Sequence, residues 1–213
     1  MKTAKDLKIP FTWEQRRPIF MDRFFYIPSH YDYKQETIPF FQKTQPIIIE
    51  YCSGNGQWIG DRALQNPEIN WIAVDKRFER ARKVWLKTYR ENIPNLTVVC
   101  GEASTFTKFY APQAEEIYVN FPDPWPKLRH AKNRLIQVEF LNDLLKILKP
   151  HGRATCVTDD ATYATQMMEE FSKCPEWKKL FHLNQWPDYG KSFFNDLWEK
   201  RGRTFHYLSF EKI

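Results

Sequence analysis

The chain has 213 residues, of which 42% are hydrophobic and 16% aromatic, so it is long enough and apolar enough to bury a substantial core in one domain. This composition excludes a disordered chain, and no apolar run approaches the ~20 residues that a membrane-spanning helix needs. The net charge of +6 favours a polyanionic partner.

The four cysteines indicate a reducing compartment. Cys52, Cys100, Cys156 and Cys174 are widely spaced, without a Cys-x-x-Cys pair or a nearby histidine pattern. Neither a disulfide framework nor a zinc site is indicated, and the four residues are typical of buried small side chains. We expect a soluble, cytoplasmic protein without a bound metal or a membrane anchor.

Short β-rich runs recur along the first half of the chain at the spacing of alternating strands and helices. They lie at residues 47–51, 71–75, 96–100 and 117–120. Their nearly continuous apolar character indicates a sheet that is covered on both faces. Between the second and third runs, apolar residues at three- and four-residue steps predict a helix over residues 78–92.

The second half continues this alternation. Residues 139–148 predict a helix that Lys149-Pro150-His151-Gly152 ends, and residues 153–157 predict a fifth strand. Asp159-Asp160 opens a further helix, and residues 204–210 alternate like an antiparallel or edge strand. We therefore expect an α/β fold with a doubly wound, Rossmann-like sheet that is mostly parallel.

The whole chain, 1–213, is expected to form one domain. Its first 40 residues are rich in proline and aromatic residues and carry Arg16, Arg17 and Arg23. This composition favours an N-terminal arm packed on or near the active site over a separate domain.

A glycine loop follows the first predicted strand. Glu50 precedes Gly54 and Gly56, and such a loop lets the backbone approach a ligand closely. Asp75 ends the next strand about 20 residues on, where a carboxylate faces ribose hydroxyls, and Glu102 follows the third strand. Taken singly, each acid fits a helix N-terminal carboxylate equally well. Three of them without a phosphate-binding lysine motif favour a ligand with hydroxyls and a positive centre, such as S-adenosylmethionine.

The most specific segment is Asn120-Phe121-Pro122-Asp123-Pro124-Trp125-Pro126-Lys127, which follows the fourth strand. Three prolines in five positions restrict the backbone, so Asp123 and Trp125 are held in set directions. Trp125 is expected either to stack on a base or to pack behind the loop. The basic run that follows contains Arg129, His130, Lys132 and Arg134. A rigid acid beside a basic run is typical of an enzyme that acts on a nucleic-acid base.

These residues resemble the bacterial tRNA (guanine-N7-)-methyltransferase family over roughly residues 47–202, with Thr158-Asp159 and Tyr163 adding to the match. The resemblance implies methyl transfer from S-adenosyl-L-methionine to N7 of a guanine in the variable loop of tRNA, with Asp123 as the catalytic residue. It also implies three sets of contacts. The donor would be bound by Glu50, Gly54, Gly56, Asp75, Glu102 and Asp123; the substrate by Lys127, Asp159, Ser192 and Asn195; and the RNA backbone by Arg129, His130, Lys132 and Arg134. The resemblance leaves the oligomeric state open.

Two positions depart from the family's pattern. The glycine loop carries Cys52 where the family usually has another glycine. Near the C-terminus, a Thr-x-Tyr-Glu cluster is replaced by Ser192-Phe193-Phe194-Asn195. Serine keeps a hydroxyl, but Asn195 lacks the carboxylate that would accept both N–H groups of a guanine.

N7 of guanine carries no proton and exposes a lone pair in the major groove, so its methylation requires no general base. We therefore expect Asp123 to position the donor and the base and to stabilise the positive charge that develops on guanine. The alternatives are a methyltransferase of an exocyclic amine and a non-catalytic tRNA-binding subunit with the same fold. A nicotinamide oxidoreductase is disfavoured because the third glycine of its motif is absent.

Overall fold

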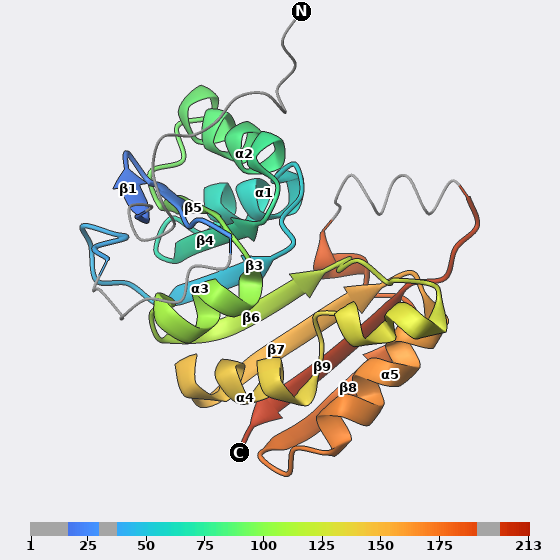
Figure 1. The fold of residues 1–213 in the computed structure, drawn as a ribbon. Coiled ribbons are helices and arrows are strands. Elements are labelled where there is room, and N and C mark those ends of the chain that lie inside the picture. The colour runs from blue at the N-terminus through green and yellow to red at the C-terminus, as the bar shows by residue number, and fades with distance from the viewer. Residues whose placement is uncertain (1–16, 30–37, 191–200) are drawn as a thin grey trace, which may run out of the picture.

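The computed structural model describes residues 17–29, 38–190 and 201–213 (Figure 1). Its centre is a nine-stranded sheet in the order β1-β2-β5-β4-β3-β6-β7-β9-β8. The strands are β1 (Ile19–Met21), β2 (Phe24–Tyr26), β3 (Ile47–Tyr51), β4 (Asn70–Asp75), β5 (Leu96–Cys100), β6 (Ala114–Asn120), β7 (Leu148–Thr158), β8 (Trp177–Leu183) and β9 (His206–Lys212). Strands β2 to β7 are parallel, whereas β9 is antiparallel to both β7 and β8.

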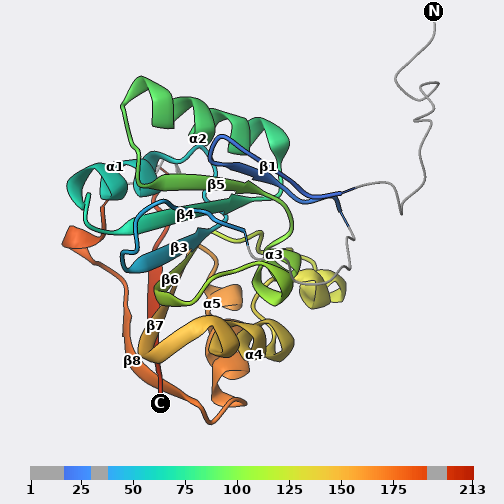
Figure 2. The ribbon, with the colours of Figure 1, turned by 90° about the vertical axis from the view of Figure 1, so that its left-hand side faces the viewer.

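Helices cover both faces of this sheet (Figure 2). They are α1 (Gln57–Gln65), α2 (Phe78–Arg90), α3 (Ala103–Phe109), α4 (Val138–Ile147) and α5 (Ala161–Ser172). One buried cluster contains side chains of α1 and α2, and another contains side chains of α3, α4 and α5. The two clusters lie on opposite faces, which is why the central strands are apolar along almost their whole length.

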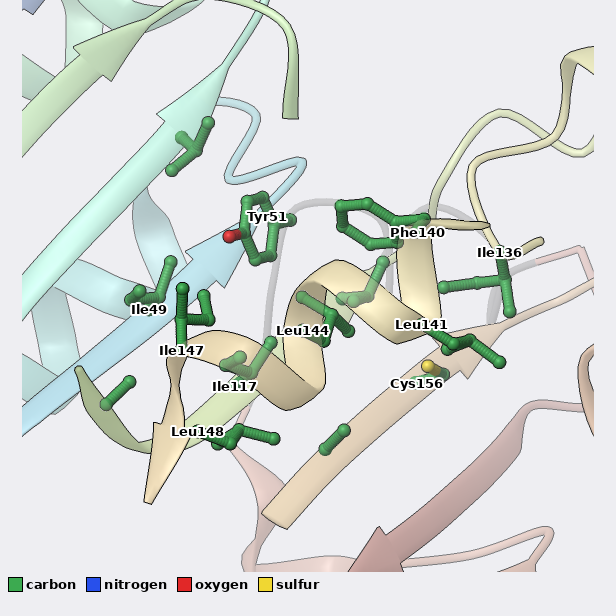
Figure 3. Close-up of a cluster of buried hydrophobic side chains, with 14 of the residues drawn as sticks. Ile49, Tyr51, Ile117, Ile136, Phe140, Leu141, Leu144, Ile147, Leu148 and Cys156 are labelled. Carbon is green, nitrogen blue, oxygen red and sulfur yellow. The ribbon is translucent and has the colours of Figure 1, made fainter. Parts of the chain in front are cut away.

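The cluster under α4 anchors the middle of the sheet (Figure 3). Phe140, Leu141 and Leu144 are buried against β3, β6 and β7, at the three- and four-residue steps of one helix face. Tyr51, at the end of β3, packs edge-on against Phe140 with ring centroids 5.5 Å apart, and its hydroxyl lies 2.6 Å from the Thr107 hydroxyl. The carboxyl ends of β3 and β6 are therefore rigidly placed.

Most predicted elements are confirmed within a few residues. The four runs of the first half are β3 to β6, the predicted helices at 78–92 and 139–148 are α2 and α4, and Asp160 caps α5 through its bond from Tyr163 N at 2.8 Å. The fifth strand begins at Leu148, earlier than predicted, and the last strand lies at 206–212. The sequence patterns do not predict β1, β2, β8 or α3, which are short or lack regular alternation.

Part of the predicted N-terminal arm belongs to the sheet. β1 and β2 form a hairpin whose second strand pairs with β5, and Ile27 N donates to Cys100 O at 2.9 Å. Ile27 packs against Gly101, where an added Cβ would lie only 2.9 Å from the Ile27 Cβ. The remainder of the arm lies outside the described residues, so its place at the active site stays a prediction. In the three described ranges, every helix is too short or too polar to cross a membrane.

Candidate active site

A cavity of about 440 Å³ opens at the carboxyl ends of the parallel strands. The strand order reverses at β3, with β4 and β5 on one side and β6 and β7 on the other, and such a switch point is where open α/β sheets bind ligands. The cavity is lined by residues that follow successive strands: Cys52, Asp75, Lys76, Arg77, Arg80, Gly101, Glu102, Phe121 to Trp125, Asn133, Leu135, Asp159 and Arg203.

The glycine loop after β3 is tightly turned. Gly54 and Gly56 have φ angles of 56° and 71°, in the left-handed region that favours glycine. At Gly56, an added Cβ would also lie 2.8 Å from the Val84 side chain of α2. Cys52 has a φ of 63°, so the family's usual glycine at this position is explained by the backbone. The loop keeps the same turn here at the cost of a strained non-glycine residue.

Asp75, at the end of β4, is fixed by the backbone around it. Its two carboxylate oxygens accept from Gly54 N at 3.0 Å and from Arg77 N at 2.8 Å, and Arg80 Nη1 lies 3.8 Å away. Burial raises the pKa of Asp75, and the backbone bonds and Arg80 oppose that rise. The side chain is thus a preorganised acceptor for ligand hydroxyls at the cavity wall.

Glu50 lies behind the loop and is 1% exposed. Its Oε1 accepts from Asn120 Nδ2 at 2.7 Å, and Asn120 in turn accepts from the Tyr189 hydroxyl. Glu50 Oε2 is buried and has no hydrogen-bond partner in the described part of the chain. Burial raises the pKa of Glu50 to about 7. A buried acceptor without a partner costs about 1–3 kcal/mol, which a ligand donor or a bound water would remove.

Glu102 occupies the N-cap position of α3, yet its side chain makes no capping hydrogen bond and lines the cavity. This geometry favours a ligand contact over a purely helix-stabilising role. Three acids that come from or follow three strands, Glu50, Asp75 and Glu102, lie around the glycine loop, and their contact with a donor stays a prediction. Only the last two line the cavity itself.

The loop after β6 forms the opposite wall. Phe121 and Trp125 have φ angles of 48° and 42°, and Phe121 N donates to Val157 O at 2.9 Å. Asp123 is exposed at the cavity, and its side chain has one long contact, 3.4 Å from Trp125 N. The backbone thus aims the Asp123 carboxylate, which remains available to a ligand. Trp125 is half-buried and contacts the His130 ring edge-on, with centroids 5.7 Å apart.

The predicted RNA contact of Arg134 is corrected by the structure. This side chain is 4% exposed, its Nε donates to Pro124 O at 2.7 Å, and its Nη1 donates to Gln166 Oε1 at 2.5 Å. The guanidinium also lies over the Tyr163 ring, 4.9 Å from its centroid. Arg134 ties the loop that carries Asp123 to α5 and has no surface to offer a phosphate.

The other members of the basic run lie at the surface. Lys127, Arg129 and Lys132 are exposed on or next to a 3₁₀ segment, Leu128–Asn133, that continues from the loop. His130 is half-buried, and its Nε2 accepts from Arg129 Nε at 3.2 Å. These four residues are placed where they can meet RNA beside Asp123, but none of them lines the cavity.

Asp159 follows β7 and lines the cavity, where it forms an ion pair with Arg203. Sequence reasoning missed Arg203 and also Tyr189, because nothing local distinguishes an arginine or tyrosine that reaches across the fold. Ser192 and Asn195 lie outside the described residues, so their predicted contacts with the substrate stay predictions.

Solved structures with related folds define the class of protein. The 16S rRNA methyltransferase KamB matches with a TM-score of 0.60 at 16% identity, over 79% of this chain and 88% of that one. A putative methyltransferase from Streptococcus mutans, SMU.1697c, solved in complex with SAH, matches with a TM-score of 0.53 at 14% identity, over 80% and 90%. The fold is that of a Rossmann-like methyltransferase.

Sequence comparison assigns the family within this class. A family described as "Putative methyltransferase" matches residues 44–206. The tRNA (guanine-N(7)-)-methyltransferase of Chlamydia muridarum is 42% identical over 98% of this chain and 97% of its own length. The chain belongs to the tRNA (guanine-N7-)-methyltransferase family, as its loop motif predicts.

Proposed function

We propose that this chain transfers a methyl group from S-adenosyl-L-methionine to N7 of a guanine in the variable loop of tRNA. The observation that carries the proposal is the position of Asp123. Its carboxylate is exposed at a cavity whose other wall holds Asp75 and Glu102, and the basic segment 127–132 continues directly from its loop.

The residues around the glycine loop fit the donor. Asp75 is held by two backbone N–H groups and can accept from ribose hydroxyls, and Glu102 stands free of its helix cap. Glu50 lies behind the glycine loop and does not line the cavity, so its contact with the methyl donor is proposed from the family resemblance alone. When bound, the sulfonium donor supplies an electrophilic methyl group. Gly54 and Gly56 leave room for its close approach, and Cys52 lines the same wall.

Asp123 acts by placement and by charge. Because N7 carries no proton, no side chain has to remove one, and the role of a carboxylate is to orient the base and stabilise the cation formed on it. A preorganised carboxylate of this kind stabilises a positive charge that develops during the reaction. Lys127, Asp159, Ser192 and Asn195 would contact the substrate, and Arg129, His130 and Lys132 would contact the RNA backbone.

A tRNA substrate and four free cysteines also support a cytoplasmic location as part of this proposal. The experiment that tests the whole proposal is incubation with unmodified tRNA and labelled donor, followed by nucleoside analysis. We expect 7-methylguanosine as the labelled product. A label on an exocyclic amine would assign the site to the alternative methyltransferase, and the absence of donor binding would assign the chain to a non-catalytic RNA-binding role.

A further inference from the structure

The excess positive charge of this protein is concentrated in one segment, α2 together with the two residues that precede it. Residues 76–90, which include α2, contain seven lysines and arginines and one glutamate, a net charge of +6. This equals the net charge of the entire chain, so all other residues together are neutral on balance. A field of one sign on a single element is typical of a surface that meets a polyanion.

Three cations within α2 are free to bind an external anion. Arg82, Lys83 and Arg90 are exposed, and no acidic side chain in the described ranges forms an ion pair with them. By contrast, Lys87 is paired with Asp61 at 3.1 Å and with Glu91 at 3.2 Å. The outward-facing cations are thus the ones that the protein itself does not neutralise.

Exposed aromatic rings lie beside these cations. Phe78 is 53% exposed and Tyr89 is 45% exposed, and with Arg82 they recur at helical spacing along one side of α2. The β1–β2 hairpin supports both rings, because Phe24 packs edge-on against Phe78 at 6.0 Å and Arg23 lies 5.0 Å from the Tyr89 centroid. Aromatic faces interleaved with cations suit RNA, since rings stack on bases while lysine and arginine contact phosphates.

The charged helix begins at the active site. Lys76, Arg77 and Arg80 line the cavity, and α2 leads away from it along the outside of the sheet beside β1 and β5 (Figures 1 and 2). From residue 76 to residue 90 the helix rise gives a reach of ~20 Å, the length of ~6 nucleotides at 3.4 Å each. A strand whose target base enters the cavity can therefore continue along α2.

We infer that the outer face of α2, formed by Arg82, Lys83 and Arg90 with Phe78 and Tyr89, docks the sugar–phosphate backbone of the tRNA substrate. This surface is separate from the segment at 127–132, which lies on the other side of the cavity. The inference rests on the proposed function, because it takes tRNA as the polyanion. It assigns to α2 the affinity for RNA, while the chemistry stays at Asp123.

The test compares two triple variants that remove the same charge. One is Arg82→Ala/Lys83→Ala/Arg90→Ala, and the matched control is Lys108→Ala/Arg153→Ala/Lys178→Ala, whose three cations are exposed on other elements and also lack ion pairs in the described ranges. Binding of unmodified tRNA is measured over a range of salt concentrations, and methylation is measured in the same preparations.

For the α2 variant we expect the slope of log affinity against log salt to fall by ~2 to 3, because each lost phosphate contact removes ~0.7–0.9. The KM for tRNA should rise ~10-fold or more, with kcat at saturating tRNA and the affinity for the donor unchanged. An α2 variant whose slope and KM match those of the control overturns the inference. A second outcome would also overturn it: the wild-type protein forms an oligomer, the α2 variant does not, and the salt slope is unchanged. That result would assign this face to a second copy of the chain. If wild-type protein fails to methylate tRNA at all, the proposed function has failed instead.

Discussion

The two walls of the cavity are built in different ways. On the donor side, Asp75 is buried and accepts two backbone hydrogen bonds, and Glu50 is enclosed with one oxygen bonded to Asn120. On the loop side, Asp123 is exposed and has only a 3.4 Å contact with Trp125 N. The donor wall is ordered by side-chain hydrogen bonds, whereas the loop wall is ordered by its backbone and by Arg134 beneath it.

On the proposed function, we expect this difference to separate two roles. The Asp75 carboxylate is already fixed and can accept from a small ligand without rearrangement, whereas the exposed Asp123 carboxylate is solvated until a ligand covers it. Changes in the donor wall should therefore alter donor affinity or stability, and changes in the loop wall should alter turnover.

Asp123→Ala should reduce methyl transfer by a factor of ~100 or more, the effect of losing one preorganised polar group in an active site. The affinity for the donor alone, measured by titration without RNA, should change little because the donor wall is intact. Turnover is measured at saturating tRNA and donor. Near wild-type turnover in this variant would remove Asp123 from the mechanism.

Glu50 should make the stability of the ligand-free protein depend on pH. Burial raises its pKa from 4.5 to about 7, so between these values the folded state binds more protons than the unfolded state. The free energy of unfolding should then fall as pH rises from about 4.5 to about 7, by ~3 kcal/mol in total. Above pH 7 the contribution of Glu50 to the free energy of unfolding is fully lost, so it no longer changes with pH.

Denaturant unfolding of wild type and Glu50→Gln at several pH values isolates this group, because other titrating residues contribute equally to both proteins. The difference between the two should grow across that pH range and then level off. Parallel curves at all pH values would show that Glu50 titrates normally in the folded protein.

Arg134→Ala should lower turnover without changing the salt dependence of tRNA binding. The substitution leaves Pro124 O and Gln166 Oε1 without their donor, at a cost of ~1–3 kcal/mol in stability, and releases the loop that carries Asp123. Arg134→Lys, which keeps the charge, should also lose activity, because an ammonium group lacks the planar fork that joins two acceptors. A smaller salt slope in Arg134→Ala than in wild type would show that Arg134 contacts the RNA backbone, contrary to its burial.

Cys52 tests the backbone of the donor wall. At a φ of 63°, replacing Cys52 with glycine should relieve ~1–2 kcal/mol of strain, offset in part by ~0.5–1 kcal/mol of added chain entropy in the unfolded state. Cys52→Ala removes the same thiol and keeps the strain, so it is the matched control. We expect Cys52→Gly to have the higher melting temperature of the two, with donor affinity close to wild type in both. Equal melting temperatures of the two variants would show that the φ angle at this position imposes no net strain on a non-glycine residue.

Local sequence patterns were sufficient to predict the central strands and the edge of the sheet at which the site lies. Nearly continuous apolar runs are buried on both faces, which is why β3 to β6 appear at the predicted positions. Asp75 and Glu102 lie at the cavity because the carboxyl ends of parallel strands share one edge of the sheet. The three prolines around Asp123 predicted a loop with a restricted backbone, because proline fixes its own φ angle.

Which charged side chains are buried could be learned from the tertiary structure but not from the sequence. Arg134 and Arg129 belong to the same basic run, yet one is buried against Tyr163 and the other is exposed. Likewise, the ion pair of Asp159 with Arg203 joins residues that are far apart in the chain. The sequence shows how many cations a segment contains. Whether each of them is buried depends on which acceptors the fold places next to it. The sequence therefore indicated where the site lies, and long-range packing decided which of its charged side chains are exposed at the cavity and which are buried.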